Sequence, residues 1–300
     1  MERRVFIKNT AASIALLSMG LPISCKNINS KKITILHTND VHSHIEPFGP
    51  NEGKKSNKGG IARRAALIQN LRASNPNTLL FDAGDIFQGT PYFNYFEGQL
   101  EFKLMSMMKY DAATIGNHDF DNGITGLHKQ MPHAKFDFIS SNYDFKNTIL
   151  SEVVQPYKIY FKDGIKIGVF GLGVQLDGLV SPEYYKETKY LNPVEITQDI
   201  TNILKQEKKC DLIICLSHLG YEYENQNKIS DISLAKKTKN IDLIIGGHTH
   251  TFLEKPTQVL NSAGEIVLVN QVGCHGIYLG KIDFYFENKH KFFSSELIGV

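Results

Sequence analysis

The sequence predicts a layered α/β domain, and three observations lead to that prediction. Short apolar runs rich in β-branched residues alternate with longer segments that carry apolar residues at the helical period. Strands separated by helices imply crossover connections, and therefore sheets with helices packed on their faces. The chain has 300 residues, of which 42% are hydrophobic, so it is long enough to bury a large core.

Apolar runs between turn-forming residues are the predicted strands: Ile33–His37, Thr78–Phe81, Ala112–Ile115, Phe136–Ser140, Ile165–Phe170, Leu212–Leu216, Leu243–Ile245, Ile266–Val269 and Tyr278–Phe286. The predicted helices between them are Ile61–Ala73, Tyr92–Met108 and Val194–Glu207. In the first helix, Ile61, Ala65 and Ile68 fall on one face. The pair Asn192-Pro193 is a start signal for the third.

The segment Pro47–Gly60 is rich in Gly, Lys, Asn and Ser, and it is predicted to be a mobile surface loop. Its lysines, Lys54, Lys55 and Lys58, could steer an anion, although a solvated loop explains them as well. No internal repeat divides the chain, and its length suits one large domain or two small ones.

Residues 1–30 are predicted to be a leader. The charged run Arg3-Arg4-Val5-Phe6-Ile7-Lys8 precedes a short apolar stretch, Ala11–Ile23, which is the layout of a signal peptide. The run itself resembles the twin-arginine export signal. Cys25 follows Leu21-Pro22-Ile23-Ser24, which resembles a lipoprotein cleavage site except at Pro22. We therefore expect an exported protein that is periplasmic or anchored at the cell envelope by a lipid on Cys25.

Composition excludes several classes of protein. With 33 basic and 31 acidic residues, the formal net charge is only +2, so a dedicated nucleic-acid binder is not expected. No apolar run approaches the roughly 20 residues of a membrane-spanning helix. The four cysteines include no CxxC pair, which argues against a disulfide scaffold or a zinc ribbon.

Metal-binding side chains follow five separate predicted strands, and they are the most informative feature of the sequence. The motifs are His37-Thr38-Asn39-Asp40-Val41-His42, Asp82-Ala83-Gly84-Asp85, Gly116-Asn117-His118-Asp119, Ser217-His218 and Gly246-Gly247-His248-Thr249-His250. In open α/β sheets the loops after the carboxyl ends of strands converge on ligand sites. Residues i and i+2 of an extended segment point to one side, so Asp40 and His42 can bind one ion together, as can His248 and His250.

The donor set mixes carboxylate, imidazole and amide oxygen, which suits several divalent ions, so the metal stays open among Zn, Mn, Fe, Mg and Co. One carboxylate can bridge two such ions, and Asp85 is the candidate. Two ions about 3.5–4 Å apart clamp the attacking and leaving oxygens of an in-line displacement at phosphorus, and they lower the pKa of a bound water towards 7. The sequence therefore predicts two divalent metal cofactors and hydrolysis by the hydroxide that they generate.

The longer stretches around three of these motifs resemble a known family. They are Ile35-Leu36-His37-Thr38-Asn39-Asp40-Val41-His42-Ser43-His44, Gly84-Asp85-Ile86-Phe87-Gln88-Gly89-Thr90 and Gly116-Asn117-His118-Asp119-Phe120-Asp121-Asn122-Gly123. The sequence resembles the calcineurin-like metallophosphoesterase superfamily and, within it, the catalytic domain of the bacterial periplasmic 5'-nucleotidase and UDP-sugar hydrolase family. The resemblance covers about Ile33 to Lys281. It implies a four-layer αββα sandwich and a dinuclear catalytic domain over residues 31–300.

The resemblance also implies a role for each site residue. One ion is held by Asp40, His42, Asp85 and His250. The other is held by Asp85, Asn117, His218 and His248. His250 stands where many nucleotidases of the family have glutamine, so here the chain follows the wider superfamily. His118 and Asp121 are the implied catalytic residues, because a carboxylate that orients an imidazole and keeps it cationic favours stabilisation of the transferred phosphoryl group or the leaving oxygen.

The implied function is that of an exported phosphoesterase with nucleotides as the first expected substrates, as in a 5'-nucleotidase. Diphosphates and cyclic phosphodiesters stay open as substrates, and so does the thiosulfate-oxidising hydrolase branch of the family. In two-domain nucleotidases a C-terminal domain grips the nucleoside, and this chain stops at Val300, so a separate protein resembling that domain is an expected partner. The alternative from another class is a non-catalytic metal-binding subunit of such a split nucleotidase. His44 and His275 are not assigned a role.

Overall fold

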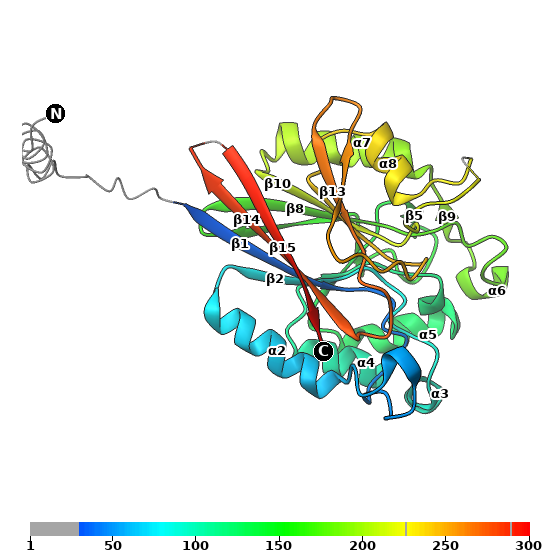
Figure 1. Ribbon diagram of the computed structural model, residues 1–300. Coiled ribbons are helices and arrows are strands. Elements are labelled where there is room, and N and C mark those ends of the chain that lie inside the picture. The colour runs from blue at the N-terminus through cyan, green and yellow to red at the C-terminus, as the bar shows by residue number, and fades with distance from the viewer. Residues whose placement is uncertain (1–29, 226, 289) are drawn as a thin grey trace, which may run out of the picture.

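Two large β-sheets pack face to face, and helices cover the outer face of each sheet (Figure 1). This computed structural model describes residues 30–225, 227–288 and 290–300. The arrangement is the four-layer αββα sandwich that the sequence predicts. The predicted signal peptide, with Arg3, Arg4 and Cys25, lies outside the described residues apart from Ser30. In the described part of the chain, no helix has the length and apolar character needed to cross a membrane.

The first sheet has seven strands, of which five are consecutive neighbours paired in parallel. In spatial order they are β15 (His290–Gly299), β14 (Tyr278–Glu287), β1 (Lys31–Thr38), β2 (Thr78–Asp82), β3 (Ala112–Ala113), β4 (Asp137–Ile139) and β6 (Val154–Gln155). Strands β1 to β4 and β6 are parallel, whereas β14 and β15 are antiparallel to their neighbours. The parallel strands therefore end at one edge.

The second sheet has six strands and a parallel centre. In spatial order they are β12 (Thr257–Leu260), β13 (Ile266–Asn270), β11 (Leu243–Gly246), β10 (Leu212–Ser217), β8 (Ile165–Leu172) and β7 (Tyr157–Lys162). Strands β8, β10, β11 and β13 are parallel, and β7 and β12 pair antiparallel at the two edges. A small antiparallel pair joins β5 (Tyr143–Asp144) and β9 (Lys189–Tyr190).

The main core lies between the two sheets, and side-chain alternation on the strands explains it. In β1, Ile33 and Ile35 point into this core, whereas Leu36 points to the helices on the other face. Ile167 and Ile214 of the second sheet pack against the first sheet in the same core. Strands covered on both faces are continuously apolar, which is why their runs stand out in the sequence.

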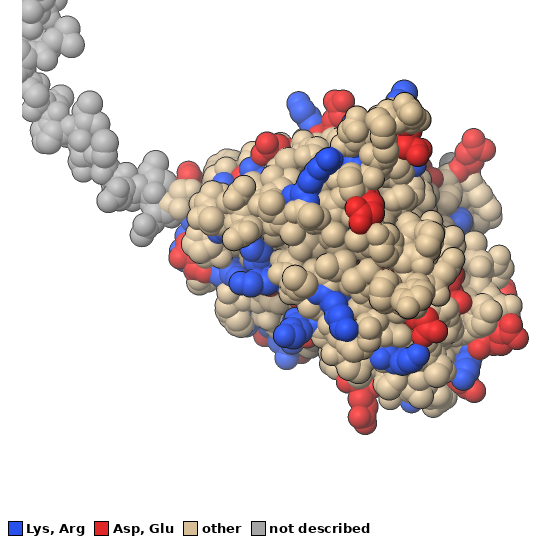
Figure 2. Space-filling model, turned by 90° about the horizontal axis from the view of Figure 1, so that it is seen from below, with Lys and Arg blue, Asp and Glu red and all other residues tan. Residues whose placement is uncertain are grey.

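Helices form the two outer layers. They are α2 (Ile61–Ser74), α3 (Pro91–Phe96), α4 (Gln99–Met107), α5 (Gly123–Gln130), α6 (Pro182–Tyr185), α7 (Pro193–Asn202) and α8 (Asp231–Lys237), with short turns η1 (Gly53–Lys55), η2 (His118–Phe120), η3 (Met131–His133) and the π-helical η4 (Ile203–Glu207). Helices α2, α4 and α5 cover the first sheet, and α7 and α8 cover the second (Figure 1). The space-filling view in Figure 2 shows acidic and basic side chains interspersed on the face seen there.

Two predicted helices are interrupted in the structure. The predicted helix Tyr92–Met108 was wrong as one piece, because the chain breaks between α3 and α4 at Glu97 and Gly98, which have φ values of 56° and 95°. A Cβ at Gly98 would lie 2.2 Å from the Phe87 ring, so the break depends on a tertiary contact. Val194–Glu207 begins as predicted, with the Asn192 side chain accepting from the backbone N–H of Val194, but its last turn is π-helical.

Some elements were not predicted from the sequence. The longest of them is β15, whose residues are largely exposed. The others are β5, β6, β7, β9, β12, α5, α6 and α8. The predicted loop Pro47–Gly60 is a loop with one short turn, closed at its base by a bridge between Pro47 and Gly59. It lies next to the site described below.

Candidate metal centre

The parallel strands of both sheets deliver polar side chains to one end of the sandwich. In the first sheet, β1 leads to Asp40 and His42, β2 to Asp85, and β3 to Asn117 and His118. In the second sheet, β10 leads to His218, and β11 leads to His248 and His250. The structure brings all seven predicted metal ligands together at the carboxyl ends of these strands, as expected for an open α/β sheet.

Asp40, His42 and His250 form a first ligand group, whose ligand atoms all lie within 4.8 Å of one another. The His42 and His250 Nε2 atoms are 3.0 Å apart, and His250 Nε2 is 3.5 Å from Asp40 Oδ1. Burial lowers the pKa of His42 to about 4, so its ring is neutral at pH 7. Its Nδ1–H donates to the Phe87 carbonyl at 3.1 Å, which leaves the Nε2 lone pair free to bind a metal.

Asp85, His218 and His248 form a second ligand group of the same dimensions. His218 Nδ1–H donates to the Ala83 carbonyl at 2.7 Å, and its fully buried Nε2 has no hydrogen-bond partner but lies 3.1 Å from Asp85 Oδ2. His248 Nδ1 lies 2.9 Å from Asn117 Oδ1, so the predicted amide ligand joins this group.

Asp85 stands between the two groups. Its Oδ2 is 3.1 Å from His218 Nε2 of the second group and 3.9 Å from His42 Nε2 of the first. A Cβ at Gly116 would lie 2.2 Å from Asp85 Oδ1, so only glycine leaves room for this carboxylate. Asp85 therefore lies within 4 Å of a ligand atom of each group.

The buried carboxylates Asp40 and Asp85 make the centre favourable for positive charge. Burial raises the pKa of Asp40 to about 8, and the neighbouring Asp85 carboxylate adds to this effect. Burial opposes a charge on His218, but Asp85 and Asp40 raise its pKa to about 10. Two buried carboxylates thus surround one imidazole, and divalent cations bound there would stabilise both carboxylates while releasing the proton. The donor set and its charges fit two divalent cations.

The backbone at the ligands is unusual. Asp40, His42, Asp85, His248 and His250 all have φ between 48° and 73°, in the left-handed region. Residues other than glycine rarely adopt this backbone conformation, although Asp and His tolerate it better than most. The sharp turns direct successive side chains inward where each strand ends.

His118 and Asp121 lie beside the first ligand group. His118 Nδ1 lies 3.0 Å from Asp121 Oδ2, and this hydrogen bond raises the pKa of His118. The His118 ring is 5.4 Å from the His42 ring, and its side chain is 37% exposed. The backbone N–H of His118 also donates to Asp85 Oδ1 at 2.8 Å. The pair is therefore partly exposed to solvent beside the ligands.

Two polar residues behind the ligands hold the loops in place. The Asp119 carboxylate accepts four backbone N–H groups, from Asp85, Ile86, Phe87 and Gly116, at 2.8–3.2 Å. Asn39 donates from Nδ2 to Asp40 Oδ2 and to the Gly273 carbonyl, each at 2.6 Å. From its place in the motif Asp119 was expected to have a structural role, but neither its backbone partners nor the role of Asn39 was predicted from the sequence.

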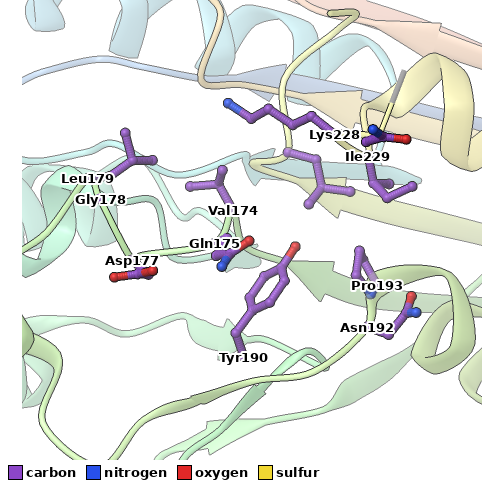
Figure 3. Close-up of a pocket in the computed structure, with 12 residues that line it drawn as sticks. Val174, Gln175, Asp177, Gly178, Leu179, Tyr190, Asn192, Pro193, Lys228 and Ile229 are labelled. Atoms are coloured by element: carbon purple, nitrogen blue, oxygen red, sulfur yellow. The ribbon is translucent and has the colours of Figure 1, made fainter. Parts of the chain in front are cut away.

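A cavity of about 570 Å³ lies beyond the ends of β8 and β10, next to this centre but separate from it. Figure 3 shows the Tyr190 hydroxyl pointing into the space near Val174 and Pro193. Leu219, which directly follows the ligand His218, lines the cavity, but none of the seven predicted ligands does.

His37, which also belongs to a ligand motif, is buried away from the ligand groups, and its Nε2 lies 2.8 Å from Asn270 Nδ2.

Comparisons with known proteins agree with this geometry. The family model described as calcineurin-like phosphoesterase matches residues 33–252. A snake venom 5'-nucleotidase from Crotalus adamanteus is 37% identical over 281 residues, which cover 87% of this chain and 46% of the relative. The chain thus spans about half the length of the curated relatives that it matches first.

Solved structures of nucleotidases are also similar to this chain. The 5'-nucleotidase precursor from Thermus thermophilus has a TM-score of 0.81 and 32% identity, with 90% of this chain and 55% of that chain covered. The NAD nucleotidase of Haemophilus influenzae has a TM-score of 0.78 and 29% identity, with 89% and 50% covered. Together with the family model and the two ligand groups, these likenesses show that this chain belongs to the calcineurin-like phosphoesterase family, whose members use two divalent metal ions.

Proposed function

We propose that this protein is an exported two-metal phosphoesterase that hydrolyses phosphate esters of nucleotides. The observation that carries the proposal is the pair of ligand groups joined at Asp85, with the half-exposed His118 beside them. Asp40, His42, Asp85 and His250 would hold one ion, and Asp85, Asn117, His218 and His248 would hold the other. When bound, two divalent ions supply Lewis acidity at the phosphoryl oxygens and lower the pKa of water.

The residues of the chain position the reacting groups. His42 and His218 each orient their ligating nitrogen by donating the other ring N–H to a backbone carbonyl. Asp121 accepts the Nδ1–H of His118 and raises its pKa, which favours the cationic form; in that form Nε2–H would donate to a phosphoryl or leaving-group oxygen. Asp119 keeps the loop of Asp85 and the loop of His118 in register.

Nucleotides are the proposed substrates because the relatives named above are 5'-nucleotidases and an NAD nucleotidase. Export is proposed from the paired arginines and the apolar stretch within residues 1–30. A lipid on Cys25, and a separate protein that resembles the C-terminal domain of nucleotidases and binds the nucleoside, belong to the proposal as well.

A substrate screen with metal control tests the proposal. The full chain is assayed with an aryl phosphate, AMP, a cyclic nucleotide and a sugar nucleotide, after chelation and after addition of Mn²⁺ or Zn²⁺. We expect turnover of esters only in metal-loaded protein, with AMP hydrolysed. A fully loaded protein that turns over none of them would refute catalysis and favour the non-catalytic metal-binding subunit. A preference for AMP over the aryl phosphate above about a hundredfold, or about 2.7 kcal/mol, would contradict the need for a partner.

A further inference from the structure

A small buried cavity of about 10 Å³ adjoins two of the loops that carry metal ligands. We call it the polar cavity, because five residues with polar side chains line it: Ser43, Arg64, Asp82, Glu101 and Tyr110. Ser43 directly follows the ligand His42, and Asp82 stands three residues before the ligand Asp85. Groups in this cavity can therefore act on the position of the ligand loops.

Arg64, in the first turn of α2, brings a buried positive charge to the polar cavity. It is only 2% exposed, and among the described residues no carboxylate oxygen lies within 4.0 Å of its guanidinium. Its Nε is buried without a hydrogen-bond partner in the same part of the chain. A guanidinium keeps its charge when it is buried, so Arg64 needs an acceptor here.

The guanidinium of Arg64 also packs against the loop that supports Asp40. A Cβ at Gly276 would overlap Arg64 Nη1, so only glycine leaves room for the guanidinium. The preceding residue, His275, donates its backbone N–H to the carbonyl of Asp40 at 2.7 Å. Arg64 is therefore in contact with the backbone that holds a proposed metal ligand.

Glu101, in the first turn of α4, is buried in the polar cavity without a direct partner. It is 3% exposed, and neither carboxyl oxygen has a hydrogen-bond partner within the described residues. The Ser43 hydroxyl is buried and unpartnered there as well. Burial raises the pKa of Glu101, whereas the nearby Ser43 hydroxyl lowers it, so the two side chains are close but not directly bonded. Each buried polar group left without a partner costs about 1–3 kcal/mol, and more if it is charged.

The other polar groups of the cavity already have partners. Asp82 Oδ2 accepts from the Thr38 hydroxyl at 2.6 Å, and Asp82 Oδ1 accepts the backbone N–H of Gly84 at 2.9 Å. The Tyr110 hydroxyl lies 2.8 Å from the Thr38 hydroxyl. A buried water needs about 10–15 Å³ and two to four polar partners. The volume of the cavity and its three remaining polar side chains meet both conditions for one water.

We propose that the polar cavity binds one water molecule that joins Arg64 and Glu101 to Ser43, and that Arg64 and Glu101 are positioning residues for the ligand His42. The water accepts a hydrogen bond from the guanidinium, and it donates to the Glu101 carboxyl group and to the Ser43 hydroxyl. This assignment rests on the proposed function, because it concerns the first metal ion. Arg64 and Glu101 act on that ion only through the turn at His42.

The turn at His42 and Ser43 needs support because its backbone is strained. Both residues are left-handed, with φ values of 50° and 53°, at a cost of about 1–2 kcal/mol per residue. Their backbone N–H groups donate to the carbonyls of Asp85 and Ile86, at 3.1 and 2.9 Å. These bonds hold the backbone of the turn, and the water holds the Ser43 side chain.

The test removes both buried polar groups together, in the double variant Arg64→Met with Glu101→Leu. Two apolar side chains of similar size restore packing, so the double variant should be more stable than Glu101→Leu, which leaves Arg64 charged and unpaired. Calorimetric titration of metal-free protein with Mn²⁺ measures the affinity for each ion without turnover. We expect the double variant to bind one of the two ions at least tenfold more weakly, which is about 1.4 kcal/mol.

Two further variants serve as controls for the titration. Glu101→Gln keeps a hydrogen-bonding group for the water, so its metal affinity should stay within about threefold of the wild type. Arg63→Met is the matched control, because Arg63 precedes Arg64 on α2 and is exposed. Its affinity for both ions should stay within about twofold. If the double variant does not fold, Ser43→Ala replaces it and should weaken one ion at least threefold.

Contrary results are distinct. Recovery of both stability and wild-type metal affinity in the double variant, or an unchanged affinity in Ser43→Ala, would make the role of the cavity structural only and refute positioning. A high-resolution crystal structure should show one water within hydrogen-bond distance of Arg64 and Glu101, and an empty cavity or a metal cation there would overturn the water site. If no ester is hydrolysed but the metal affinities change as expected, the proposed function fails and the positioning role stands.

Discussion

The Asp119 carboxylate should be one of the most sensitive positions for stability, and the variant Asp119→Asn tests this. Each carboxylate oxygen accepts two backbone N–H groups: Oδ1 those of Ile86 and Phe87, and Oδ2 those of Asp85 and Gly116. Asparagine keeps one oxygen and points an NH₂ group at the other two donors. Burial raises the pKa of Asp119 to about 7, so the measurement is made above about pH 8, where the carboxylate is charged and two hydrogen bonds to it are lost, at about 1.5–3 kcal/mol each. The expected destabilisation is about 3–6 kcal/mol, a large part of a typical total of about 5–15 kcal/mol.

Urea unfolding of metal-free protein measures this loss of unfolding free energy without the effect of bound metal. The variant and the wild type can be compared directly if their m values are equal. Asp144→Asn is the matched control, because Asp144 Oδ1 accepts a single N–H, from Lys146 at 3.0 Å, at a partly exposed position. The asparagine oxygen can keep that bond, so a change below about 0.5 kcal/mol is expected. A loss below about 1 kcal/mol in Asp119→Asn would refute the view that this carboxylate holds the two loops together.

Further predictions concern the metals, the proposed catalytic pair and export. Asp85→Ala should lose bound metal and turnover together, because Asp85 alone is assigned to both ions. Elemental analysis of the metal-loaded wild type should find close to two ions per chain. One ion or fewer in fully active enzyme would contradict a bridged site. His118→Asn should keep its metal and lose about 10²–10⁴-fold in rate. Metal loss in that variant would make His118 a ligand. Arg3→Lys combined with Arg4→Lys should block export and leave active enzyme in the cytoplasm, whereas an unchanged exported yield would show that the paired arginines are incidental.

The strands that carry the site could be predicted because each contains a short run rich in apolar residues. Buried on both faces, β1, β2, β10 and β11 appear as such runs, and each ligand follows its run within a few residues. Strand β15 was not predicted, because it is an exposed edge strand whose His290–Gly299 sequence has few buried residues. Its hydrogen bonds depend on β14, and no periodicity of its own indicates them.

Tertiary contacts explain what else sequence patterns left out. The break at Gly98 exists because the Phe87 ring occupies the place of a side chain there. Asp119 acts through backbone N–H groups more than 30 residues earlier as well as nearby, and backbone donors leave no mark in a sequence. Lys55 and His275 are 220 residues apart, so only the folded chain puts them within 3.3 Å. The ligands could be named from motifs, whereas the residues that hold and surround them could not.

The left-handed backbone at five ligand residues has a consequence for protein engineering. Such a conformation costs a residue other than glycine up to about 1–2 kcal/mol, and less for Asp and His. Glycine at Asp40 or His248 would relieve that cost and remove a metal ligand in the same step. A library selected only for heat resistance would therefore collect inactive variants at these positions. Selection for thermostability of this protein needs a metal-binding screen beside it. At these positions glycine fits the left-handed backbone best, whereas metal binding requires Asp or His.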